Sequence, residues 1–200
     1  MSAFIYLASQ SPRRRQLLEQ LGVRYQLLLP DAGEDAESIE AVLGSEPPAT
    51  YVKRVTALKL AAALQRRKRR GLVPAPILCS DTTVALGRTI YGKPLDGADA
   101  QRMLAELSGK THRVLTAVSI GTERQQLQVL SESRVTFATL TRSQILAYVA
   151  TGEPMGKAGA YAVQGAAAAF ISKISGSYSG IMGLPLFETA QMLRSLGLKF

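Results

Sequence analysis

Three consecutive arginines begin the first predicted helix of this chain, directly after a short apolar segment. Residues 4–7 predict a strand, and Ser11 followed by Pro12 is typical of the start of a helix, which we expect to end near Gly22. Residues 13–15 place three positive charges where the helix dipole is already positive. A bound anion would resolve this conflict, because free N–H groups, serine hydroxyls and guanidinium groups together form a phosphate site. A solvated basic turn is the alternative interpretation of the same residues.

The order of the remaining elements predicts a mixed α/β protein, with α+β character, and argues against a barrel. Hydrophobic periodicity predicts strands over residues 25–29, 77–86, 111–120 and 127–140, helices over residues 50–69, 96–107 and 141–150, and a last helix that begins at Pro185. The segment 30–48 is a loop with six acidic residues: Asp31, Glu34, Asp35, Glu37, Glu40 and Glu46. The segment 152–185 is rich in glycine, which allows the backbone to approach a ligand or another strand closely.

The net charge of +9 is concentrated in two clusters. Residues 13–15 and 66–70 hold eight of the 24 basic residues, and the rest of the chain has 16 basic against 15 acidic residues. A nucleic-acid-binding face would spread its charge more widely, so we expect no nucleic-acid partner. Residues 66–70 close a predicted helix, where cations suit the dipole, and we interpret them as a solvated helix end.

The composition also predicts the cellular location of the protein. No apolar run approaches the ~20 residues of a membrane helix, and the N-terminus lacks the pattern of a signal peptide, so we expect no membrane partner. Cys79 is the only cysteine, which excludes an intrachain disulfide and favours a cytoplasmic location. His112 is the only histidine, so the common Cys/His zinc patterns are excluded, and we interpret it as a structural residue of a strand.

Asp81 is the most unusual residue of the predicted strands, because aspartate is disfavoured in a strand interior. Its carboxylate, like that of Glu34, is suited to binding a hard divalent cation or activating a water. Lys59 lies beside the buried stripe of its helix, where a lysine either extends to solvent or reaches into a site. The other candidates are cations suited to phosphate and hydrogen-bonding groups suited to a nucleotide: Arg13, Arg14 and Lys93, with Ser9, Ser11, Thr82 and Gln164. The absence of a Walker loop argues against P-loop chemistry.

These residues belong to motifs that follow one another along the chain. The motifs are Leu7-Ala8-Ser9-x-Ser11-Pro12-Arg13-Arg14, Asp81-Thr82-x-Val84, Gly92-Lys93-Pro94, Ser108-Gly109-x-x-His112-x-Val114-x-Thr116, Lys157-Ala158-Gly159-x-Tyr161-x-x-Gln164-Gly165 and Gly183-Leu184-Pro185. Through them the chain resembles the Maf family of nucleoside triphosphate pyrophosphatases over nearly its whole length. The resemblance implies hydrolysis of a nucleoside triphosphate to the monophosphate and pyrophosphate, with Mg²⁺ or Mn²⁺ as the cofactor. It also implies one domain over residues 1–200, as a single body or as two lobes, in a homodimer. The implied fold is similar to that of the inosine triphosphatases, a long mixed β-sheet with flanking helices and a central cleft.

The resemblance also implies roles for individual residues. Asp81 would be the general base and would share the metal with Glu34, while the phosphate-binding cations would be Arg13, Arg14, Lys59 and Lys93. Arg13, Thr82 and Gln164 are similar to the branch that acts on dTTP and UTP, whereas the 7-methyl-GTP branch usually has Trp, Gln and Glu there. Two positions depart from the family: Leu58 stands where a glutamate usually precedes the lysine, and the loop around Glu34 is less acidic than usual. The alternatives are a 7-methyl-GTP pyrophosphatase, and a nucleic-acid-binding or cell-division regulator without essential catalysis.

Overall fold

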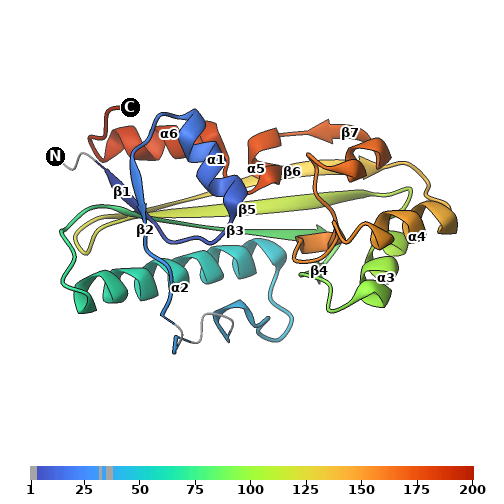
Figure 1. Ribbon diagram of the computed structural model, residues 1–200, viewed down its shortest axis with the longest axis horizontal. Coiled ribbons are helices and arrows are strands. Elements are labelled where there is room, and N and C mark those ends of the chain that lie inside the picture. Colours follow the sequence, from blue (N-terminus) through green and yellow to red (C-terminus); the bar gives the residue numbers. More distant parts are fainter. Residues whose placement is uncertain (1–3, 32, 35–37) are drawn as a thin grey trace.

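The computed structural model describes residues 4–31, 33–34 and 38–200, and Asp35 and Glu37 of the acidic loop lie outside these ranges. Within them the chain forms a long mixed sheet with helices on both faces, which confirms the predicted fold class (Figure 1). The sheet has seven strands in these ranges, in the order β2-β1-β3-β5-β6-β7, and β4 pairs with β3 beside this path. No helix in the same ranges is long and apolar enough to span a membrane.

The predicted strands and helices are all present, with small shifts at their ends. The strands are β1 (Ile5–Leu7), β2 (Tyr25–Leu27), β3 (Ile77–Leu86), β4 (Thr89–Tyr91), β5 (Thr111–Gly121), β6 (Gln126–Phe137) and β7 (Ile171–Ser175). The α-helices are α1 (Pro12–Gln20), α2 (Pro48–Arg69), α3 (Gly97–Leu107), α4 (Arg142–Ala150), α5 (Tyr178–Met182) and α6 (Leu186–Ser195). Three short 3₁₀ helices are η1 (Ser38–Glu40), η2 (Ala158–Ala160) and η3 (Ala166–Phe170). The sequence predicted neither β7 nor these short helices.

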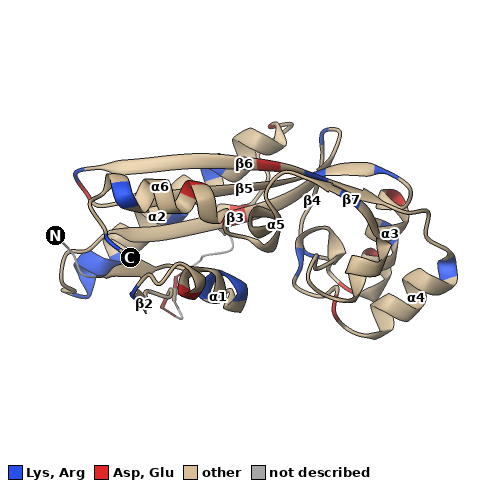
Figure 2. Cartoon of the chain, turned by 90° about the horizontal axis from the view of Figure 1, so that it is seen from above, with Lys and Arg blue, Asp and Glu red and all other residues tan. Residues whose placement is uncertain are grey.

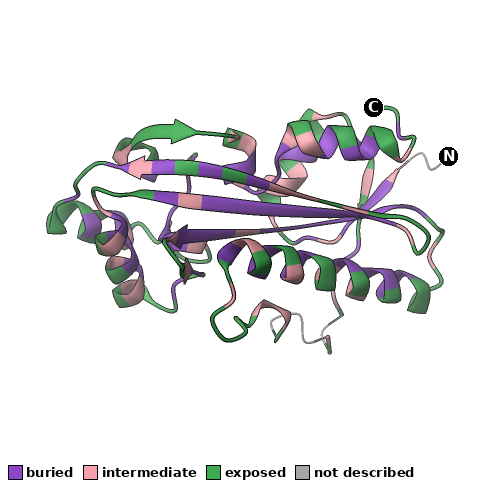
Figure 3. Ribbon diagram, turned by 180° about the vertical axis from the view of Figure 1, so that it is seen from behind, coloured by how far each residue is buried: buried purple, intermediate pink, exposed green. Residues whose placement is uncertain are grey.

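The alternation of side chains along β5 divides the interior into layers on the two faces of the sheet. Leu115 and Ala117 pack with Val55 of α2 on one face. Val118 and Ile120 belong to the core on the other face, which α1 and α6 cover (Figure 1). Because both faces are covered, the central strands are largely buried, whereas β7 at the edge is mostly exposed (Figure 3). The central strands therefore form a rigid frame for side chains that project from them.

One edge of β3 is open in its middle. β1 pairs with the start of β3, at Ile77 and Leu78, and then turns away toward α1. β4 pairs with β3 only from Val84 onward. Between these two pairings, β3 has no neighbouring strand on this side in the described part of the chain. Asp81 lies at the centre of the open stretch, so the fold places this carboxylate at a gap in the sheet.

The structure confirms His112 as a structural residue. Its side chain is buried in β5, Nε2 lies 2.8 Å from the hydroxyl oxygen of Tyr161, and the ring packs edge-on against Phe137. Nδ1 has no hydrogen-bond partner within the described residues. Burial lowers the pKa of His112 from 6.5 to about 4, because the charged imidazolium would lose its hydration.

We therefore expect the protein to lose stability as the pH falls from 6.5 toward 4. In this window the unfolded chain binds a proton at His112 and the folded chain does not, so protonation favours unfolding. The full loss is about 3 kcal/mol, reached below the folded pKa. Urea unfolding between pH 7 and 5.5 would measure the slope, since few carboxylates titrate there. His112→Gln removes the only histidine, and an equally steep slope in that variant would contradict the assignment.

Candidate active site

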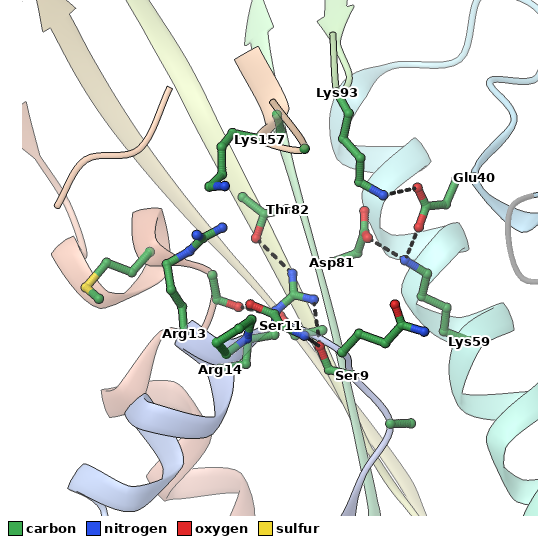
Figure 4. A pocket seen from close by; sticks show the side chains of 18 of the residues that line it. Ser9, Ser11, Arg13, Arg14, Glu40, Lys59, Asp81, Thr82, Lys93 and Lys157 are labelled. Atoms are coloured by element: carbon green, nitrogen blue, oxygen red, sulfur yellow. Dashed lines mark hydrogen bonds and ion pairs between the residues drawn. The ribbon is translucent and has the colours of Figure 1, made fainter. Parts of the chain in front are cut away.

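A cleft with a volume of about 560 Å³ opens at the free edge of β3. Small-molecule sites have volumes of ~300–1,000 Å³, so the cleft can hold a nucleotide-sized ligand. The structure brings every predicted site residue to the wall of this cleft: Ser9, Ser11, Arg13, Arg14, Glu34, Lys59, Asp81, Thr82, Lys93 and Gln164. Figure 4 shows side chains from α1, α2, β3 and the segment around Lys157 pointing toward one another.

A chain of alternating charges occupies the α2 side of the cleft (Figure 4). Nζ of Lys59 donates to Oδ1 of Asp81 at 2.6 Å and to Oε1 of Glu40 at 2.7 Å. Nζ of Lys93 donates to Oε2 of the same Glu40 at 3.3 Å. Burial opposes the charge on Lys59, but Asp81 and Glu40 together raise its pKa, so the ammonium is retained. Lys59 therefore reaches into the site and does not extend to solvent.

Glu40 is the residue that the sequence-based reasoning missed. The resemblance assigned the carboxylate of the acidic loop to Glu34, yet the structure places Glu40, carried by η1, next to the lysines. Both oxygens of Glu34 instead accept hydrogen bonds at 3.0 Å from Nε of Arg66. Those bonds to Arg66 are the main reason that the pKa of Glu34 falls to about 2. The available signal was weak, because Glu40 was one of six acidic residues in a single predicted loop.

The interpretation of residues 66–70 as a solvated helix end is wrong for Arg66 and Arg67. Only 4% of Arg66 and 7% of Arg67 is exposed. Arg66 lines the cleft and also donates from Nη1 to the carbonyl of Leu28 at 3.0 Å. Arg67 pairs with Glu123 in the turn between β5 and β6. The physical reason is that two distant segments pack against the end of α2. The connection after β2 covers Arg66, and the turn between β5 and β6 covers Arg67. Arg69 and Arg70 are exposed, as predicted.

The opposite side of the cleft carries positive charges that form no direct ion pair with a carboxylate of the described residues. We call Arg13, Arg14 and Lys157 the cation wall; none of the three forms a salt bridge within the described ranges. Arg14 has neutral partners: Nε donates to the carbonyl of Gly183 at 2.8 Å, and Nη1 and Nη2 donate to hydroxyls of Ser9 and Thr82 at 3.3 Å. Burial lowers the pKa of all three residues, and for Lys157 the neighbouring Arg13 adds to the effect. An anion between them would relieve this strain, which is what the charge at the start of α1 predicted.

Lys157 was not among the predicted site residues. It precedes η2 and points into the cleft beside Arg13 (Figure 4). Its place in the glycine-rich segment was the signal that could have identified it. Figure 2 shows basic residues toward both ends of the molecule as well as near its middle.

Asp81 and Thr82 reach the cleft from opposite faces of β3. Asp81 contacts Lys59 on the α2 side, whereas the hydroxyl of Thr82 lies 3.3 Å from Nη2 of Arg14 and 2.9 Å from the hydroxyl of Thr116 on the other side. This opposition follows from the strand period of two, which places consecutive side chains on opposite faces. Gln164 is exposed at the mouth of the cleft. Ser11 is the N-cap residue of α1 but its hydroxyl does not cap the helix, which leaves it directed at the cleft.

Comparison with known proteins identifies the family. Residues 4–196 match the family described as Maf-like protein. The chain belongs to the Maf family. This Maf-family chain is 73% identical over 199 residues to the dTTP/UTP pyrophosphatase of Albidiferax ferrireducens, with 100% of both chains covered. It is 64% identical over 200 residues to the dTTP/UTP pyrophosphatase of Cupriavidus metallidurans, again with 100% of both covered.

A solved structure shows a weaker likeness to this Maf-family chain. The nucleoside-triphosphatase, or dITP/XTP pyrophosphatase, of Mycobacterium abscessus gives a TM-score of 0.45 at 15% identity. The match covers 68% of this chain and 75% of that chain. A likeness of this size carries no argument about the site.

The donor groups of this Maf-family cleft fit a hard divalent cation. The described ranges contain no group of three or more His, Cys, Asp and Glu side chains that could hold a metal ion. Magnesium, however, usually takes only one or two carboxylates from the protein and completes its shell with water and substrate phosphates. Asp81 and Glu40 supply two such carboxylates, and both accept hydrogen bonds from the ammonium group of Lys59. A cation shared by both would find the oxygen ligands it prefers once phosphates are present.

Proposed function

We propose that this Maf-family protein hydrolyses dTTP and UTP to the monophosphate and pyrophosphate. One observation carries the proposal: a strand carboxylate, Asp81, lies at an open sheet edge between lysines and a cation wall without acidic partners. Such a site can hold a polyanion on one side and deliver a water from the other. The name dTTP/UTP pyrophosphatase, carried by relatives of 64–73% identity over their full length, supports this choice of substrate.

In the proposed mechanism the cation wall binds the phosphates. Asp81 orients the attacking water and takes its proton. Oδ1 already accepts from Lys59, and Oδ2 has no protein partner within the described residues, so Oδ2 is the oxygen that faces the water. Lys59 and Lys93 stabilise the negative charge that builds up on the leaving pyrophosphate. Preorganised cations of this kind act without reorienting during the reaction.

We assign the metal-binding role to Asp81 and Glu40, with Mg²⁺ or Mn²⁺ as the ion. A cation held by these two carboxylates would supply Lewis acidity toward the phosphates and toward the attacking water. Glu34, to which the resemblance gave this role, is held by Arg66 and Arg69 and serves in our proposal to fix the acidic loop. We also infer a cytoplasmic homodimer: Cys79 is buried and reduced, and the dimer follows from the family resemblance. Sedimentation equilibrium tests the dimer.

The proposal is tested by pyrophosphate release. We expect turnover of dTTP and UTP in the presence of Mg²⁺ or Mn²⁺, and no turnover after EDTA removes divalent cations. A coupled assay for pyrophosphate, run on a panel of common and modified nucleoside triphosphates, measures both. Undiminished turnover in EDTA would contradict the metal-assisted mechanism, and release of phosphate without pyrophosphate would contradict the reaction itself.

Gln164 is our candidate for reading the base. Thymine and uracil present two carbonyls beside one N–H, and the amide of Gln164 can both donate and accept. Gln164→Glu replaces the donor with a negative charge. We therefore expect kcat/KM for dTTP and UTP to fall by at least ~10-fold, which corresponds to the free energy of about one hydrogen bond. The loss for the cationic base of 7-methyl-GTP should be smaller. Gln191→Glu, an exposed position on α6, makes the same chemical change away from the cleft and should have no effect. Equal losses for all three nucleotides would show that Gln164 does not read the base.

A further inference from the structure

Glu153 lies outside the cleft wall, yet it holds the segment that carries Gln164. Oε1 accepts a hydrogen bond from the hydroxyl of Tyr148 at 2.8 Å, and Oε2 accepts from the backbone N–H of Ala166 at 3.0 Å. Burial opposes the charge of this carboxylate, but the N–H of Ala166 and the hydroxyl of Tyr148 keep its pKa below the usual value. Glu153 is therefore an ionised group that joins the end of α4 to the start of η3.

The carboxylate also rests directly on the backbone of Gly165. A Cβ atom built on Gly165 would lie 2.2 Å from Oε1 of Glu153, closer than real Cβ contacts allow. The backbone of Gly165 has φ −103° and ψ −159°, which other residues can adopt, but a Cβ atom here would have to displace the carboxylate of Glu153. Glu153 and Gly165 thus fit together with no spare room.

This contact fixes a tight turn. The N–H of Gly165 donates to the carbonyl of Ala162 at 3.0 Å, and the N–H of Ala168 donates to the carbonyl of Gly165 at 3.0 Å. Gln164 is the third residue of the turn 162–165, so its side chain leaves the backbone at a corner. Residues 161–164 line the cleft. A shift at Gly165 or Ala166 would therefore move Gln164 relative to a bound base.

We propose that Glu153 is a positioning residue that sets the discrimination between nucleotide bases through the turn that carries Gln164. The inference rests on the proposed function, because it requires Gln164 to read the base. Glu153 does not contact the nucleotide in this account. Its carboxylate holds the Gly165 turn, and the turn holds the amide of Gln164 where it meets the carbonyl and N–H of uracil or thymine. Sites that act through hydrogen bonds lose much of their selectivity when the groups shift by a fraction of an ångström.

The test compares UTP with CTP, whose bases differ in the groups that an amide would meet. Glu153→Ala should lower the ratio of kcat/KM for UTP to that for CTP by about 10-fold, mainly through a higher KM for UTP. Glu153→Gln should restore most of the ratio, since its amide oxygen can accept from Ala166 and its NH₂ group can donate to the oxygen of Tyr148. Tyr148→Phe is the control. It removes a partner of Glu153 but leaves the bond to Ala166, so the ratio should stay within about 3-fold of the parent.

Two further variants make the result decisive. Gly165→Ala disturbs the same contact from the other side, because the added Cβ atom would displace the carboxylate of Glu153. It should lower the ratio as Glu153→Ala does. If one of the two variants folds poorly, the other still tests the contact. In the double variant Glu153→Ala with Gln164→Ala, the ratio should fall no further than in Gln164→Ala alone, because both act through one side chain.

The outcomes separate the two proposals. If Gln164→Ala leaves the ratio unchanged, the base-reading role of Gln164 fails, and the inference about Glu153 fails with it. If Gln164→Ala lowers the ratio but Glu153→Ala lowers kcat/KM equally for UTP and CTP, Glu153 only stabilises the fold and the inference alone is overturned. Additive losses in the double variant would overturn it as well.

Discussion

Asp81→Asn should reduce kcat by a factor on the order of 10² to 10⁴ while leaving the fold intact, the usual range for loss of a positioned general base. Asparagine has nearly the same shape and keeps an oxygen that can accept from Lys59, but it cannot take a proton from water or balance a cation. Steady-state kinetics with UTP at saturating Mg²⁺ measures the loss, and thermal unfolding measures the fold.

The matched control is Asp96→Asn. Asp96 is the N-cap of α3, where its side chain accepts from the N–H of Asp99, and asparagine caps helices about as well. The control therefore makes the same chemical change outside the cleft and should leave kcat unchanged. Turnover of Asp81→Asn within a few-fold of the parent, which is under ~1 kcal/mol of barrier, would falsify the assignment of Asp81 as the base.

Arg66→Gln should destabilise the protein by roughly 1–3 kcal/mol, the usual cost of leaving a buried hydrogen-bonding group without its partner. Arg66 is buried, and its removal leaves the partly exposed carboxylate of Glu34 with Arg69 as its remaining salt-bridge partner. The carbonyl of Leu28 loses its donor as well. We also expect a higher KM for UTP, because Arg66 and Glu34 line the cleft and hold the loop that ends at Glu40. Urea unfolding and steady-state kinetics measure the two effects.

Arg69→Gln provides the comparison within the same helix end. Arg69 also pairs with Glu34, but 55% of its side chain is exposed, and exposed ion pairs contribute little to stability. The stability loss should therefore be several-fold smaller than for Arg66→Gln. Equally small losses in the two variants would mean that the end of α2 is solvated throughout, as the sequence alone had indicated.

The sequence predicted the parts of the site that depend on local pattern. Asp81 was identified because a carboxylate is unusual in a buried strand, and β3 has the predicted bounds, Ile77–Leu86. The charge conflict at the start of α1 predicted an anion site, and the cation wall has the unbalanced charge that such a site needs. The strand bounds and the crowding of positive charge at the start of α1 depend on neighbours in the chain, so hydrophobic period, helix caps and charge near a helix end can predict them.

The failures concern contacts between distant segments. Glu34 and Glu40 are equivalent in composition, and only the path of the loop between β2 and α2 decides which of them meets Lys59. The burial of Arg66 depends on the connection after β2, 38 residues away at Leu28. The role of Glu153 was also missed, because its partner Ala166 follows by 13 residues and offers only a backbone N–H. No local pattern encodes such partners.

The open stretch of β3 also separates a sheet residue that tolerates substitution poorly from loop residues that tolerate substitution well. Asp81, the proposed general base, belongs to a central strand that pairs with β5 from Ile77 to Ala85, so it sits in a part of the protein that opens only with the whole fold. The groups that we propose to contact the rest of the nucleotide come from surface segments, at the start of α1, in the acidic loop and around the Gly165 turn. Loops of this kind accept substitutions and insertions without disturbing the sheet. A protein built in this way can acquire a new preference for one nucleotide over another by altering its loops, while the hydrolytic step remains unchanged.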